Sequence, residues 1–88
     1  MEFEFDPAKS RSNKAKHGID FEQAQGLWRD VYAYEVDAVT KDEPRTKRVG
    51  EYQGKLWAAI FTMRSERKIR IISVRRAHGD EARKYQSD

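Results

Sequence analysis

Hydrophobic and polar residues alternate at the start of the chain and then change to a different spacing. Phe3 and Phe5 are separated by acidic residues, a period of two that predicts a short edge strand. Asp6 followed by Pro7 is typical of a helix start, and Gly18 is suited to the left-handed residue that ends a helix. The pattern therefore predicts an edge strand followed by a helix that ends just before Gly18.

A second apolar stripe follows Asp20, which is another residue suited to capping the start of a helix. The apolar positions after it recur at helical spacing, which predicts a second helix with one buried face: Phe21, Ala24, Leu27 and Trp28. We expect Leu27 and Trp28 to lie in the core, together with Trp57 and Phe61 from later in the chain.

The residues after Asp30 predict strands and one short helix. The Gln53-Gly54 pair between two strand-like runs favours a tight hairpin, and Ser65-Glu66-Arg67 marks a second turn. The expected strands are residues 31–36, 45–52, 55–63 and 68–76, with a polar loop at 37–44 and a helix at 80–85. This order predicts an α+β fold with a mostly antiparallel sheet of four to five strands, two N-terminal helices and a short C-terminal helix.

Length and composition restrict the chain to a single small domain, residues 1–88. The absence of cysteine excludes disulfides, thiolate zinc sites and cysteine nucleophiles. No apolar run is long enough to span a membrane and the acidic N-terminus is unlike a signal peptide, so we expect a cytoplasmic protein. Because so small a core leaves little room for a deep cavity, we expect a shallow surface site without a cofactor or metal.

Charge is distributed unevenly along the chain. Residues 1–40 have five cations and eight anions, a net of −3, whereas residues 41–76 have eleven cations and four anions, a net of +7. Residues 77–88 have a net of −1, which gives +3 overall. Such asymmetry favours a polyanionic partner for the C-terminal half, with an ordinary solvated surface as the alternative.

Three groups of residues occur in an order and spacing that resembles a known family. The first group is Asp6-Pro7-Ala8-Lys9, Asn13, Lys16-His17-Gly18-Ile19, Phe21-Glu22 and Ala24. The second is Glu43-Pro44-Arg45, Gly50, Gly54 and Thr62-Met63-Arg64, and the third is the run from Ile69 to Ala77 with Glu81 and Arg83. Over about residues 5–85 the chain resembles the BrnT family, although Phe5 and Val74 stand where members often have Trp and Ala.

The resemblance implies a toxin of a type II toxin–antitoxin system, with a RelE-like fold and ribonuclease activity. It also implies a BrnA-type antitoxin that neutralises the toxin and, in complex with it, binds operator DNA. RNA would be the substrate, and no membrane partner is expected. The alternative function is a non-catalytic module whose basic segment binds nucleic acid or an acidic partner.

Metal-independent RNA cleavage requires a base for the 2′-hydroxyl proton, cations for the phosphorane and an acid for the 5′ oxygen. Arginine suits the second task because it binds phosphate oxygens bidentately and stays charged. The hairpins predict that Tyr52 faces Lys55, Gly50 faces Trp57, Arg64 faces Lys68 and Leu56 faces Arg76. Charges then gather at two ends of the sheet, roughly 20 Å apart.

We expect the catalytic end to be the one that contains Arg75. The candidate catalytic residues are Arg75 and Glu51 at this end, Lys47 between the two ends, and Arg64 at the other end. The candidate nucleic-acid-binding residues are Arg48, Lys55, Arg76 and His78.

The candidates also have structural interpretations, which for Lys47 and Arg76 are those of ordinary solvated surface residues. Arg75 is placed to form an ion pair with Glu81 or Glu51, and Arg64 with Glu43 across the strands. His17 suits acid–base chemistry, but a cation is also favourable at the end of a helix. The side chains of Tyr32 and Tyr34 either pack in the core, which we expect, or stack on bases.

Overall fold

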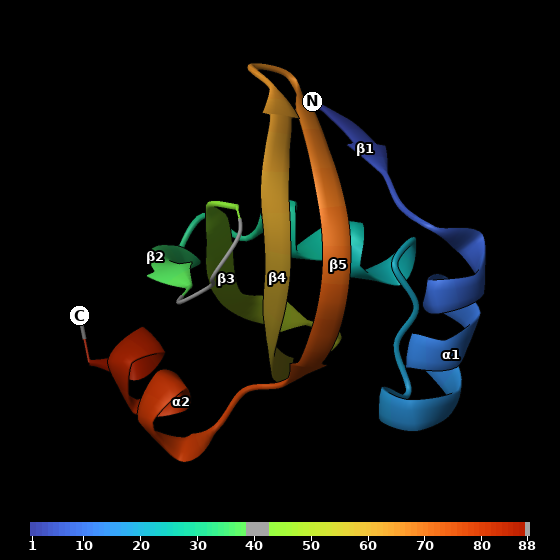
Figure 1. Cartoon of the computed structure of the whole chain (residues 1–88). Coiled ribbons are helices and arrows are strands. Elements are labelled where there is room, and N and C mark those ends of the chain that lie inside the picture. The colour runs from blue at the N-terminus through green and yellow to red at the C-terminus, as the bar shows by residue number, and fades with distance from the viewer. Residues whose placement is uncertain (39–42, 88) are drawn as a thin grey trace.

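The computed structural model describes residues 1–38 and 43–87, which form a five-stranded sheet with helices on both sides (Figure 1). The elements are β1 (Glu2–Glu4), α1 (Pro7–His17), the 3₁₀ helix η1 (Gln23–Arg29), β2 (Tyr34–Ala38), β3 (Arg45–Tyr52), β4 (Lys55–Ser65), β5 (Lys68–Arg76) and α2 (Gly79–Gln86). The strand order is β1-β5-β4-β3-β2, with β1 parallel to β5 and every other pair antiparallel. The predicted α+β class is confirmed. None of these helices is long and apolar enough to cross a bilayer.

One face of the sheet packs against α1 and η1 and contains the hydrophobic core. Its buried members are Ile19, Phe21, Ala24, Leu27, Trp57, Ala59, Phe61, Ile69, Ile71 and Val74. Trp28 packs edge-on against Phe61, with ring centroids 5.1 Å apart. Leu27, Trp57 and Phe61 are buried as predicted, and Trp28 is partly buried against them. Burial of each large side chain contributes about 1.5–3 kcal/mol.

The first helix is attached to the sheet by polar side chains. Asn13 donates hydrogen bonds to the carbonyl oxygens of Ile19 and Val74, at 2.8 and 2.9 Å, and Ser10 accepts one from the Phe21 amide at 2.9 Å. Because Ser10 and Asn13 are the buried residues of α1, these bonds explain how a helix without an apolar stripe stays on the core.

The second helix differs from its prediction. The segment is a 3₁₀ helix from Gln23 and not an α-helix from Asp20, although the Asp20 carboxylate does accept the Gln23 amide at 2.7 Å. Gly26 lies in the middle of η1, where a Cβ would come within 2.5 Å of the Tyr52 ring. Glycine is a poor α-helix former, and the close approach of Tyr52 requires it here.

The strand expected at residues 31–36 begins later, at Tyr34. Val31 and Tyr32 are 86% and 76% exposed, so the expectation that Tyr32 lies in the core is wrong. The Asp30 carboxylate accepts a hydrogen bond from the Tyr32 amide at 2.9 Å, which holds this segment in a turn before the strand. Residues 39–42 of the predicted polar loop lie outside the described residues.

The hairpin registers are confirmed for β3 and β4 but are shifted in places between β4 and β5. Tyr52 pairs with Lys55 and Gly50 with Trp57. Arg76, however, pairs with Trp57 and not with Leu56, and Lys68 pairs with Ser65 and not with Arg64. Irregularities after Ile60 and Met63 cause both shifts, and a one-residue shift exchanges the faces on which side chains lie.

Candidate functional site

A buried carboxylate joins two of the predicted catalytic cations. Glu81 in α2 is 4% exposed. Its Oε1 and Oε2 accept hydrogen bonds from the two Nη atoms of Arg75, at 2.8 and 2.9 Å. The Lys47 ammonium group donates to Oε2 at 2.6 Å, and the His78 amide donates to Oε1 at 2.8 Å. The ion pair between Arg75 and Glu81, one of the two structural pairings expected for Arg75, is therefore present.

The cluster favours the charged forms of Glu81 and Arg75. The hydrogen bonds from Arg75 contribute most to holding the pKa of Glu81 far below its usual value. Burial opposes this effect, and the hydrogen bond from Lys47 adds to it. The hydrogen bond to Glu81 in turn raises the pKa of Arg75. With two cations and one anion, the cluster carries a net positive charge.

Within residues 1–38 and 43–87, both cations retain donors that no protein group uses. The Nη1 group of Arg75 donates to Glu81 and to the Arg76 carbonyl oxygen, which leaves its Nε–H and one Nη2–H unused. Lys47 uses one of its ammonium hydrogens for Glu81. The Arg75 and Lys47 side chains are 30% and 23% exposed, so an anion from solution can reach them.

The helix that carries Glu81 is held on the sheet by polar contacts. Glu81 is its buried residue, and the Glu81 carbonyl oxygen accepts a hydrogen bond from the Tyr34 hydroxyl at 3.1 Å. The Tyr85 hydroxyl donates to the Asp30 carboxylate at 2.7 Å, and the Glu51 amide donates to the same oxygen at 2.7 Å. Burial would raise the pKa of Asp30, but these bonds hold it below its usual value. The position of α2 thus depends on Glu81 and on the Asp30–Tyr85 pair.

His78 adjoins this cluster through its amide, and Glu51 lies four residues beyond Lys47 along β3. Glu51 is on the same face of β3 as Lys47, because side chains alternate along a strand. Its side chain is exposed and, within the described residues, forms no ion pair. His78 is exposed at the N-terminus of α2.

Arg48 is held within the protein. Its guanidinium group donates to the carbonyl oxygens of Leu27 and Asp30, at 3.0 and 3.3 Å, and to the Glu35 carboxylate at 2.8 Å. It also lies over the Trp28 ring, 5.5 Å from the centroid. These contacts give Arg48 a structural role, while its predicted role in nucleic-acid binding stays a prediction.

Arg64 lies at the other end of the sheet. It is six positions beyond Ala58 along β4, and Ala58 pairs with Arg75, so the two arginines are roughly 20 Å apart. Arg64 forms an ion pair with Glu4 at 3.6 Å. The structure does not bring Arg64 to the Glu81 cluster, and its catalytic role stays a prediction.

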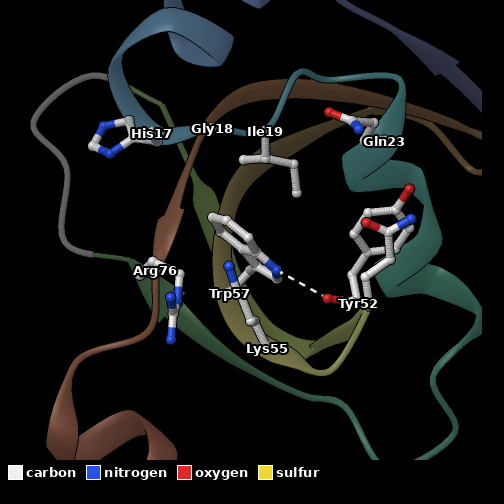
Figure 2. Close-up of a pocket in the computed structure, with 9 residues that line it drawn as sticks. His17, Gly18, Ile19, Gln23, Tyr52, Lys55, Trp57 and Arg76 are labelled. Carbon is white, nitrogen blue, oxygen red and sulfur yellow. Dashed lines mark hydrogen bonds between the residues drawn. The ribbon is translucent and has the colours of Figure 1, made fainter.

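Arg76 and Lys55 line a pocket on the opposite face of the sheet from Glu81. The pocket has a volume of about 190 Å³ and is also lined by His17, Tyr52 and Trp57 (Figure 2). Arg76 lies over the Trp57 ring, 5.5 Å from its centroid, and the Trp57 indole donates to the Tyr52 carbonyl oxygen at 3.2 Å. The sequence favours a structural role for His17 at the end of its helix. It does not indicate that the end of α1 meets the β3–β4 turn, which places His17 at the pocket.

Comparison with known proteins identifies the family. A family model described as "Ribonuclease toxin, BrnT, of type II toxin-antitoxin system" matches residues 5–81. The chain belongs to the BrnT family. The crystal structure of the Brucella abortus ribonuclease toxin BrnT is similar, with a TM-score of 0.67 and 29% identity over 89% of this chain and 97% of that one. Among curated proteins, none gives a significant match.

Membership of the BrnT family decides between the two functions that the sequence left open. The family is one of ribonuclease toxins, so the chain is an endoribonuclease and not a non-catalytic binding module. As the toxin of a type II system, it has RNA as its substrate and an antitoxin as its partner.

Proposed function

We propose that this BrnT-family toxin cleaves RNA at the Lys47–Arg75 cluster without a metal ion. The observation that supports the proposal is the Glu81 carboxylate, which both cations contact through hydrogen bonds of 2.6–2.9 Å. Two fixed cations that converge on the oxygens of one anion have the arrangement that stabilises a phosphorane.

The reaction is transfer of a phosphoryl group to the neighbouring ribose oxygen. The 2′ oxygen forms a bond to phosphorus and the bond from phosphorus to the 5′ oxygen breaks, which leaves a 2′,3′-cyclic phosphate and a 5′-hydroxyl group. Glu51 accepts the proton of the 2′-hydroxyl, and His78 supplies the proton that the 5′ oxygen takes up. The unused hydrogens of Arg75 and Lys47 bind the non-bridging oxygens, on which negative charge increases.

Glu81 acts in this proposal as a positioning residue. It fixes the side chains of Arg75 and Lys47 before RNA binds, so the cations need no reorganisation when the charge develops. Because its two oxygens are occupied by protein donors, Glu81 does not contact the substrate.

A BrnA-type antitoxin is the proposed partner, and the complex of the two proteins is proposed to bind operator DNA. The support is the order of sequence motifs together with the positive charge of the segment that builds the sheet. An acidic segment of the antitoxin would cover the same cations that bind RNA.

The test is cleavage of single-stranded RNA by the purified protein in the presence of EDTA. We expect fragments with 2′,3′-cyclic phosphate and 5′-hydroxyl ends, identified by mass spectrometry. RNA that stays intact both with and without added ribosomes, in a sample shown to be folded by circular dichroism, contradicts the proposal.

A further inference from the structure

The pocket that contains Arg76 is built by segments far apart in the chain. His17 comes from the end of α1, Tyr52 and Lys55 flank the β3–β4 turn, and Arg76 ends β5. In Figure 2, His17 and Arg76 lie on one side of the pocket and Tyr52 on the other, with Trp57 and Lys55 between them.

No carboxylate among the described residues neutralises the two cations of this pocket. Seven cations of the strand-forming segment make ion pairs: Arg45, Lys47, Arg48, Arg64, Lys68, Arg70 and Arg75. Within the described residues, Lys55 and Arg76 make none, and no carboxylate lines the pocket. Arg67 also forms no ion pair with any residue that the structure describes, and it lies at the far end of the sheet in the β4–β5 turn.

The size and lining of the pocket restrict what it can hold. A volume of about 190 Å³ is smaller than the pockets that enclose drug-sized ligands, so it fits one small unit. The aromatic ring of Tyr52 offers a stacking surface, and Lys55 and Arg76 offer charge for a phosphate group. Aromatic rings beside cations are the combination that binds single-stranded RNA.

We propose that this pocket binds one nucleotide of the substrate RNA, with its phosphate on Lys55 and Arg76 and its base against Tyr52. The proposal rests on RNA cleavage at Arg75, which directly precedes Arg76 in β5 and faces the other side of the sheet. The RNA strand therefore passes over the end of the sheet, and the pocket holds a nucleotide next to the cleaved bond.

The test uses a single-stranded RNA with 2′-O-methyl groups, which binds but is not cleaved because its nucleophile is blocked. Its affinity is measured by fluorescence anisotropy for the wild type, for Lys55→Gln and for Arg76→Gln. We expect each substitution to weaken binding about tenfold and to lower the slope of log affinity against log salt by about 0.7. Arg67→Gln is the matched control, because it removes an unpaired cation outside the pocket, and we expect unchanged affinity.

Two outcomes overturn the proposal. One is that the Lys55→Gln Arg76→Gln double variant, folded by circular dichroism, binds the oligonucleotide as the wild type does. The other is that this variant keeps its RNA affinity but loses binding to the antitoxin, which assigns the pocket to the protein partner. A failure of the proposed cleavage activity would be seen in a separate assay, because the wild-type protein would then leave unmodified RNA intact.

Discussion

Arg75 and Arg76 are adjacent in β5, yet their guanidinium groups lie on opposite faces of the sheet. Arg75 binds Glu81 of α2, and Arg76 lies over Trp57, a member of the core beneath α1 and η1. The irregularity of register after Ile60 determines which arginine faces which side. The end of β5 thereby presents one cation to the proposed cleavage site and one to the proposed nucleotide pocket.

Substitution of Glu81 tests its positioning role. We expect Glu81→Gln to lower the free energy of unfolding by about 2 kcal/mol, because it removes charge-assisted hydrogen bonds while both cations keep some exposure to water. We also expect kcat to fall more than KM rises, because the cations are no longer fixed for the transition state. Urea denaturation and steady-state kinetics measure the two effects. A loss of stability at unchanged kcat argues for a purely structural Glu81.

Acid should destabilise the protein through the same carboxylate. The pKa of Glu81 is lowered in the folded state, mainly by the hydrogen bonds from Arg75, so its contribution is present above the ordinary carboxyl pKa. That contribution is lost progressively as the pH falls below about 4.5. Unfolding free energies measured from pH 7 to pH 3 should fall more steeply for the wild type than for Glu81→Gln. Parallel curves would show that Glu81 is not the group that titrates.

Tyr85 predicts a separate effect in alkali. Burial and the hydrogen bond to Asp30 raise the pKa of Tyr85 to about 12. Since the folded-state pKa is raised, the stabilisation is complete below pH 10 and is lost as the pH rises from about 10 to 12. Tyr85→Phe should lower the free energy of unfolding by about 1 kcal/mol at pH 7. The variant should also lack the part of the loss of stability in alkali that comes from Tyr85. Thermal melts of both proteins between pH 8 and pH 11 make the comparison, and an equal alkaline decline in both contradicts it.

Binding of the antitoxin should depend on salt. If it covers the cations that the strands expose, raising the ionic strength screens the attraction over about 8 Å and lowers the affinity. Titration calorimetry at low and high salt measures the change. An affinity that does not vary with salt would indicate an apolar interface, for which Val31 and Tyr32 are the exposed candidates.

Local sequence signals predicted most of the fold. The Asp6-Pro7 start and Gly18 end of α1, the Gln53-Gly54 hairpin and the buried face of Leu27 all depend on neighbours in the chain, and all are present. One missed feature, the late start of β2, follows from the local hydrogen bond between the Tyr32 amide and Asp30. Other missed features depend on distant contacts. Gly26, a poor α-helix former within η1, is required by the approach of Tyr52 from another element of the fold.

The candidate site was predictable in part for the same reason. Arg75 and Glu51 were assigned to one end of the sheet because the strands that carry them both neighbour β4, whereas Lys47 was expected between the two ends. The contact that Arg75 and Lys47 both make with Glu81 depends on where α2 folds back onto the sheet. The spacing of residues along the chain does not predict this position. His17 was separated from Arg76 by most of the chain, so only the folded structure places both at one pocket.

The most direct test of the proposed site compares Arg75 with Arg64 at the two ends of the sheet. Single-turnover cleavage of RNA in EDTA is measured for Arg75→Ala and Arg64→Ala, with Arg75→Lys as a variant that keeps the charge and with folding verified by thermal melts. We expect Arg75→Ala to lower the rate about 100- to 1000-fold, as loss of a transition-state donor does, and Arg64→Ala to keep most of the activity. An inactive, folded Arg64→Ala beside an active Arg75→Ala would contradict the account and place the site at the Arg64 end.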